Sequence, residues 1–270
     1  MNNLLQRVVM ALLLVPLAIG ILWLHSSIQV GICALVGIGC LYEWFSMAYP
    51  KQSWKPLLHF LGCVGLFAGI GVYLNLFWQH ACFGLYLYMV TALFYRKSAH
   101  NCQGWLAIGG AAYIALAFSS LLYMVVFWPK NLVAFILATV WVTDIGAYFT
   151  GKWLKGPRMA PVISPNKTWS GFFGGVFWAC VLNSICWLLG WMHSTWIWAS
   201  IGIALAAHGG DLLESWVKRK FGVKDSGRLI PGHGGLLDRL DSLMGVSALI
   251  GLAAVLIRGL SIISGDYIFD

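Results

Sequence analysis

The 270-residue sequence has little charge, since Asp, Glu, Lys and Arg make up 10% of it, against about 25% in an average globular chain. Acidic residues are the scarcer sign, with nine in the whole chain. The hydrophobic share is 60%, and the mean hydropathy is +0.80. A soluble protein is hard to reconcile with this composition, and we expect an integral membrane protein whose length is used as apolar spans of about 20 residues each.

The sequence also lacks any Cys-x-x-Cys pair. Its seven cysteines are scattered, mostly inside apolar runs, which is typical of small buried hydrophobic residues. A disulfide framework or a zinc site is therefore not expected. The net charge of +8 does not indicate a nucleic-acid partner, because the basic residues lie in short loops between apolar runs, where they act as topology signals and meet anionic lipid headgroups.

Apolar segments recur along the whole chain and predict an all-α, polytopic membrane protein with about nine transmembrane helices. We treat it as one membrane domain, with N-terminal helices over 1–130 and a C-terminal catalytic region over 131–270. Eight spans remain possible, because the fourth segment is short. The predicted segments are 8–24, 28–47, 57–77, 80–95, 104–127, 131–150, 171–191, 195–217 and 242–262.

The basic residues predict the orientation of these spans. With the N-terminus inside, every Lys and Arg except Lys130 and Arg258 falls on the inner side, as the positive-inside rule requires. Two long polar loops, about 151–170 and 218–241, then face the cytoplasm.

The polar residues concentrate in one stretch, 208–242, which holds five of the nine acids. On a helix, Asp211, Glu214, Ser215 and Lys218 are spaced i, i+3, i+4, i+7 and share one face. Carboxylates at the end of a membrane span are costly and indicate function. A solvated helix end with internal salt bridges is the alternative.

Further along, Pro231-Gly232-His233-Gly234-Gly235 predicts a flexible turn whose N–H groups suit phosphate oxygens. Asp238 and Asp241 then open the last predicted span. Carboxylates from two helices, Asp211 with Asp238 or Asp241, could share one Mg²⁺ that also binds substrate phosphates. A helix N-cap is the plainer interpretation of Asp238.

Two other acids lie in apolar surroundings. Asp144 falls within a predicted span, shortly before a rigid loop, Ser164-Pro165-Asn166-Lys167-Thr168, that suits an anionic headgroup. A solvated loop is the alternative there. Glu43 lies near the inner end of the second predicted span, where we expect it to pair with a Lys or Arg of an inner loop and assign it no catalytic role.

The run from Ser215 to Ser242 reads S-x-x-K-R-x4-K-D-S-G-x3-P-G-H-G-G-x-L-D-R-x-D-S. It resembles the signature of the phosphatidate cytidylyltransferases, and the segment from Asp144 through Thr168 is also similar to that family. Ser170 stands where many members are expected to have Glu or Gln. The resemblance implies that CTP and phosphatidate give CDP-diacylglycerol and pyrophosphate with Mg²⁺, and a second cation is possible. It also implies a bacterial cytoplasmic (inner) membrane location, a site facing the cytoplasm, and a possible homodimer.

Carried onto this sequence, the resemblance and the residue patterns predict three groups of site residues. The predicted catalytic residues are Asp144, Asp211, Lys218, Asp238 and Arg239. The predicted substrate-binding residues are Lys167, Thr168, Ser215, Arg219, Lys224, Asp225, His233 and Gly234. The predicted metal ligands are Asp211, Asp238 and Asp241.

Two other functions use similar residues. Another Mg²⁺-dependent membrane phosphoryl-group transferase, of the polyprenyl-phosphate or lipid kinase type, would also need cytoplasmic carboxylates, and the nucleotide consumed would distinguish it. A cation-coupled transporter would distribute its acids through the middle of the membrane, whereas most acids here cluster at one face.

Overall fold

The computed structural model describes residues 16–49, 102–227, 229 and 234–264. A short helix over residues 16–21 precedes the first long one. The long helices of this part are α2 (Ser26–Ala48), α5 (Cys102–Phe127), α6 (Lys130–Leu154), α7 (Trp169–Leu188), α8 (Thr195–Lys220) and α9 (Leu237–Ser264). Two strands, β1 (Arg158–Ala160) and β2 (Ser164–Thr168), lie between α6 and α7.

Within these residues, five helices are long and apolar enough to cross a membrane: α2, α5 over Trp105–Phe127, α6, α7 and α8. The last predicted segment, 242–262, lies within α9. The chain is therefore a mostly helical integral membrane protein. The total of nine spans stays a prediction, because the segments 57–77 and 80–95 and the start of the first segment lie outside the described residues.

The fold departs from the all-α prediction in the loop at about 151–170. There the chain forms a two-stranded antiparallel hairpin in which Arg158 pairs with Thr168 and Ala160 with Ser164. Lys155 ends α6 in the left-handed region, at φ 47°, and its N–H donates to the Gly151 carbonyl. The chain therefore leaves the helix sharply enough for β1 to turn back onto β2. Sequence periodicity misses this hairpin because its strands are only three and five residues long.

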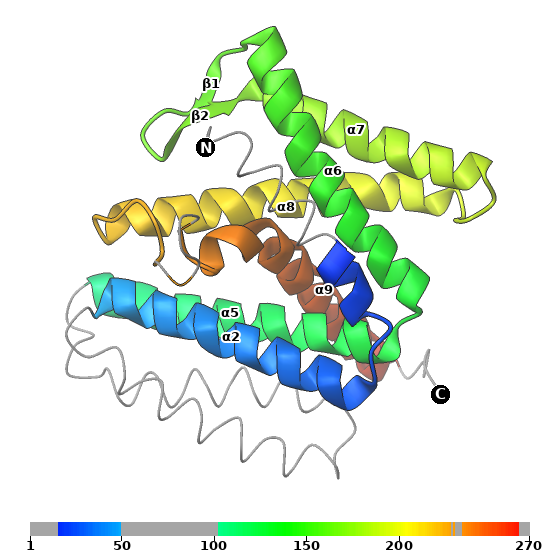
Figure 1. The fold of residues 1–270 in the computed structure, drawn as a ribbon, viewed down its shortest axis with the longest axis horizontal. Coiled ribbons are helices and arrows are strands. Elements are labelled where there is room, and N and C mark those ends of the chain that lie inside the picture. The colour runs from blue at the N-terminus through cyan, green and yellow to red at the C-terminus, as the bar shows by residue number, and fades with distance from the viewer. Residues whose placement is uncertain (1–15, 50–101, 228, 230–233, 265–270) are drawn as a thin grey trace.

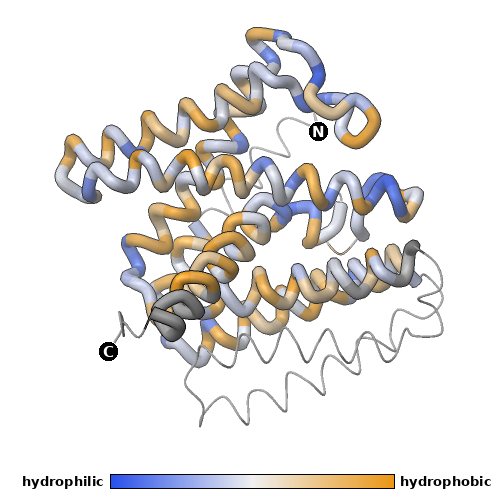
Figure 2. Tube along the Cα trace, turned by 180° about the vertical axis from the view of Figure 1, so that it is seen from behind, coloured by the Kyte–Doolittle hydropathy of each residue, from blue (hydrophilic) through white to orange (hydrophobic). Residues whose placement is uncertain are grey.

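The helices form two groups joined by α9 (Figure 1). In one group α2 packs on α5, and in the other α6 packs on α7 and α7 on α8. α9 contacts both α5 and α8. Figure 2 shows hydrophilic residues gathered on the hairpin and on the C-terminal end of α8. The polar ends of several elements thus meet at one end of an otherwise apolar body.

The α2–α5–α9 group has a packed apolar core. Buried members include Trp44 of α2, Ile114 of α5 and Leu237 of α9. The Trp44 indole donates to the Ala107 carbonyl at 2.9 Å, so its one polar atom is satisfied inside the core. This packing fixes the first turn of α9, which bears the predicted ligand Asp238.

Candidate functional site

The site is built around the crossing of α8 and α9. A Cβ on Gly210 of α8 would overlap the Asp241 carbonyl oxygen and the backbone of Gly245 on α9. A Cβ on Gly245 would in turn overlap the backbone of Ala206 and Gly210. Only glycine lets the two backbones approach this closely. The crossing brings the acids of α8 and α9 together.

The predicted helix face on α8 is present. The Ser215 hydroxyl donates to Asp211 Oδ1 at 3.4 Å, and the Lys218 ammonium lies 3.4 Å from Glu214 Oε1. Glu214 is buried, with 3% of its surface exposed. The four side chains therefore form one polar row along α8, directed at α9 and at the hairpin.

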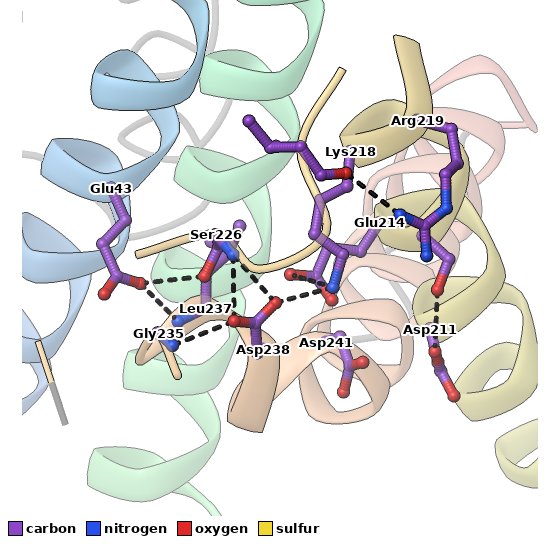
Figure 3. A network of polar contacts seen from close by, with 12 residues as sticks. Glu43, Asp211, Glu214, Lys218, Arg219, Ser226, Gly235, Leu237, Asp238 and Asp241 are labelled. Atoms are coloured by element: carbon purple, nitrogen blue, oxygen red, sulfur yellow. Dashed lines mark hydrogen bonds and ion pairs between the residues drawn. The ribbon is translucent and has the colours of Figure 1, made fainter. Parts of the chain in front are cut away.

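Asp238 of α9 is held by donors from three directions (Figure 3). Lys218 Nζ lies 2.6 Å from Asp238 Oδ1, and the Gly235 N–H donates to Oδ2 at 2.9 Å. The Ser226 N–H is shared between Oδ1 and Oδ2, at 3.2 and 2.9 Å. Burial acts to raise the pKa of the Asp238 carboxyl, but these donors outweigh it and hold the pKa below its ordinary value. Asp238 is therefore ionised, and it closes the loop between α8 and α9.

Glu43 of α2 is a residue whose role the sequence did not predict. Its Oε2 accepts from the Leu237 N–H at 2.9 Å and from the Ser226 hydroxyl at 3.2 Å. A Cβ on Gly227 or on Gly235 would collide with its carboxylate. In the described contacts Glu43 thus bonds backbone and hydroxyl donors of the 226–237 region, whereas a Lys or Arg partner was expected. No local signal could have found this, because its partners are 183 and 194 residues away.

The hairpin closes the site from the other side. Lys167 Nζ of β2 lies 2.6 Å from Asp211 Oδ2. Arg219 Nε donates to the Ile163 carbonyl at 3.1 Å. The Thr168 hydroxyl caps α7 by accepting from the Gly171 N–H at 3.1 Å, which gives this predicted substrate ligand a local structural role.

Ser170, the departure from the expected family pattern, also has a local role. Its hydroxyl accepts from the Gly156 N–H at 3.0 Å and lies 3.1 Å from that of Thr168. The polar side chain at this position therefore ties the segment after α6 to the start of α7.

Two more acids border the crossing. Asp144 of α6 accepts from the Ser242 hydroxyl at 3.2 Å. Asp241 accepts from the Ser242 N–H at 2.7 Å, and it lies near enough to Asp211 and Glu214 to interact with them electrostatically. Neither Asp144 nor Asp241 has an ion pair within the described residues. The structure thus gathers Asp144, Asp211, Glu214, Asp238 and Asp241, which we call the acid cluster.

Other predicted residues lie at the margin of the acid cluster. Arg239 is exposed on the first turn of α9, and Lys224 and Asp225 are exposed in the turn after α8. Gly234 adopts a φ of 83°, a conformation that favours glycine, and a Cβ there would lie 3.2 Å from Asp238 Oδ2. His233 lies outside the described residues.

The charge balance of the acid cluster tests whether it suits a metal ion. Two ammonium groups, Lys167 and Lys218, face five carboxylates. Both oxygens of Glu214 are buried without a hydrogen bond. Among the described residues, no group of three or more His, Cys, Asp or Glu side chains lies close enough together to hold a metal ion in this arrangement. The carboxylates outnumber the lysines, and such an excess of hard oxygen donors still fits a divalent cation such as Mg²⁺. In this structure a lysine neutralises Asp211 and another neutralises Asp238.

Comparisons with known proteins agree with the sequence signature. The model of the cytidylyltransferase family matches residues 5–257. Phosphatidate cytidylyltransferase of Brucella suis biovar 1 (strain 1330) is 35% identical over 266 residues, which cover 93% of each chain. The protein of the same name from Staphylococcus aureus (strain COL) is 45% identical over 119 residues, which are 43% of this chain and 46% of that protein.

Proposed function

Because the chain belongs to the cytidylyltransferase family, we propose that it transfers the cytidylyl group of CTP to phosphatidate. The products are CDP-diacylglycerol, a precursor for phospholipid biosynthesis, and pyrophosphate. The structural observation that supports this most is the pairing of acids with lysines at one end of the helices. Lys167 and Lys218 each lie 2.6 Å from a carboxylate of the acid cluster.

The reaction requires charge neutralisation more than proton transfer. A phosphate oxygen of phosphatidate attacks the α-phosphorus of CTP, and the bond from that phosphorus to the bridging oxygen of the β-phosphate breaks. The bonding electrons leave with pyrophosphate. The nucleophile is already an anion, so no general base is needed. The barrier comes from bringing anions together, and preorganised cations lower such barriers.

Two lysines of the site can supply this preorganised positive charge. The ammonium groups of Lys167 and Lys218 approach the acid cluster from different elements, β2 and α8. Arg219 lies beside Lys218 at the end of α8 and links it to the hairpin. We assign phosphate binding to these three residues, with Lys224 and Arg239 reaching the same phosphates from the exposed margin.

We assign the cation-binding site to the acid cluster. Asp211, Asp238 and Asp241 would hold Mg²⁺, and Asp144 borders the same space through Ser242. When bound, the ion supplies positive charge at the reacting phosphates. Lys167, which now neutralises Asp211, would then be free to bind substrate, whereas Lys218 would keep its contact with Asp238 and reach a phosphate with its remaining N–H groups. A second cation would take up remaining carboxylate charge.

The location follows from the same residues. The acid cluster and the hairpin lie at the end of the helices where α6 and α8 finish and α7 and α9 begin. The distribution of basic residues supports placing this end on the cytoplasmic side of a bacterial inner membrane. CTP then arrives from water and phosphatidate from the adjoining leaflet. A homodimer is proposed from the family resemblance alone, and cross-linking in the membrane tests it.

A labelled-nucleotide assay tests the proposed function. The purified chain in detergent receives phosphatidate, Mg²⁺ and CTP labelled either at the α- or at the γ-phosphate. We expect the α-label in a lipid-extractable product and the γ-label in pyrophosphate. Transfer of the γ-label to lipid would instead identify a lipid kinase, and no lipid product in either arm contradicts the proposal.

A further inference from the structure

We propose that an apolar cavity beside the acid cluster holds part of one acyl chain of the lipid substrate. The inference rests on the proposed function, since it takes the substrate to be a lipid phosphate. It adds a binding site for the apolar part of that lipid, separate from the groups that bind phosphate.

The cavity has a volume of about 160 Å³ and lies among α2, α5, α8 and α9. Its wall is almost entirely apolar. Its lining includes six large side chains: Trp44, Trp105, Tyr113, Leu213, Trp216 and Met244. An apolar cavity of about 150 Å³ stays dry and takes up apolar ligands. A hydrocarbon chain therefore fits this wall, whereas water or a phosphate would find almost no polar partner.

The cavity and the acid cluster share a wall. Glu214 lines the cavity and also contacts Lys218 at 3.4 Å. Tyr113 lines the cavity and lies near enough to Asp241 and Glu214 to interact with them electrostatically. A lipid whose phosphate lies at the acid cluster would therefore reach the cavity with the first part of a chain.

Two residues that line the cavity are also exposed on the outside of apolar helices. Trp105 of α5 has 57% of its surface exposed and Leu213 of α8 has 42%. Both belong to helices that are apolar and long enough to cross a membrane. The exposed apolar face of such a helix meets lipid. An acyl chain can therefore enter sideways from the bilayer, and this favours lipid over nucleotide as the occupant.

Gly109 provides a way to fill the cavity. It lines the cavity, and a Cβ built on it meets nothing within 4 Å. Gly202 of α8 is a matched control, because its Cβ also meets nothing within 4 Å and it does not line the cavity. Both Gly→Leu substitutions lie in helices and gain the same helix propensity.

The kinetic test compares long-chain phosphatidate with its dihexanoyl analogue. We expect Gly109→Leu to raise the KM for the long-chain lipid about tenfold, the loss that corresponds to about two buried methylene groups. The KM for CTP should not change, and Gly202→Leu should match the wild type. An unchanged KM for the long-chain lipid, or a raised KM for CTP, would overturn the proposal. If Gly109→Leu does not fold, Leu213→Trp fills the cavity from α8 instead.

A labelling experiment separates this inference from the proposed function. A phosphatidate with a photoactivatable diazirine on one acyl chain is cross-linked to the wild-type protein without CTP. We expect labelled peptides from 105–114 and 213–217, and their loss in Gly109→Leu but not in Gly202→Leu. Labelling elsewhere overturns the cavity assignment even in an active enzyme. Labelling here without CTP turnover overturns the proposed reaction and leaves the lipid site standing.

Discussion

The two ends of the acid cluster carry the same kind of ion pair in different surroundings. At the Asp238 end, the carboxylate lies 2.6 Å from Lys218 and also accepts from the N–H groups of Ser226 and Gly235. At the Asp211 end, the carboxylate lies 2.6 Å from Lys167, and its further hydrogen bond in the described contacts comes from a hydroxyl. The exposed fraction of the side chain is 13% for Asp238 and 31% for Asp211.

This difference indicates that the two ends of the acid cluster have different roles. Asp238 is tied to the loop before α9, so changing its partners disturbs the fold. Asp211 is more exposed and is paired with a lysine on the hairpin. Breaking this ion pair to bind a substrate or cation therefore costs less free energy. We infer that the Asp238 end positions the site and that the Asp211 end exchanges ligands.

The largest expected effect is that of Asp238→Asn, which should lose CTP-dependent turnover and also stability. The substitution removes the charge opposite a mostly buried ammonium. Removing one partner of a fully buried pair costs about 3–5 kcal/mol, and partial exposure reduces this to about 2 kcal/mol. The Tm of the protein in detergent should fall by about 5 °C. An unchanged Tm would show that Asp238 is not a structural anchor.

Glu43→Ala should come next, although Glu43 lies on a helix outside the predicted catalytic region. Loss of its bonds to Ser226 and Leu237 lets the loop before α9 shift, and a displacement of about 1 Å can cost about 100-fold in kcat. Glu43→Gln keeps an acceptor oxygen and should restore most of the rate. If Glu43→Gln is as inactive as Glu43→Ala, the charge itself acts in the reaction and the positioning role is wrong.

The helix crossing gives a matched glycine pair. Gly210→Ala should destabilise the protein by about 1–3 kcal/mol, because its Cβ would overlap the backbone of α9. Gly209→Ala, one residue earlier, meets nothing within 4 Å and should leave the Tm unchanged or slightly higher. Thermal unfolding of both variants under one set of conditions checks this. Equal Tm values would contradict the close crossing.

The smallest effect is expected for Lys167→Ala, which removes the cation at the exchanging end. Lys167→Ala should leave the Tm nearly unchanged and raise the KM for CTP or phosphatidate about tenfold, the equivalent of about 1.4 kcal/mol of lost binding. Lys155→Asn is the control, because it removes a charge from the same region at an exposed position whose left-handed backbone suits asparagine. Steady-state kinetics of the two variants give the KM values to compare. Equal KM values would show that Lys167 does not bind substrate.

Local sequence patterns predicted much of this site. The spacing from Asp211 to Lys218 predicted a shared helix face, and the contacts of Ser215 and Lys218 along α8 confirm it. The apolar runs predicted α2, α5, α6, α7 and α8 to within a few residues at most of their ends. These features depend on helical periodicity, which neighbouring residues determine.

Features that depend on distant parts of the chain were not predictable. The contact between Glu43 and Leu237 joins residues 194 positions apart. The hold on Asp238 comes from N–H groups of a loop, and no side-chain pattern encodes their direction. The β1–β2 hairpin was missed because its strands are short and irregular. These arrangements follow from tertiary packing.

We propose that the acid cluster is the site of cytidylyl transfer and that its Asp211 end exchanges ligands. The most direct test measures CTP-dependent CDP-diacylglycerol formation and the Tm of Asp211→Asn on the same purified sample. We predict that turnover is lost while the Tm stays at the wild-type value, in contrast to Asp238→Asn. Near-normal turnover in Asp211→Asn would contradict the assignment of the site.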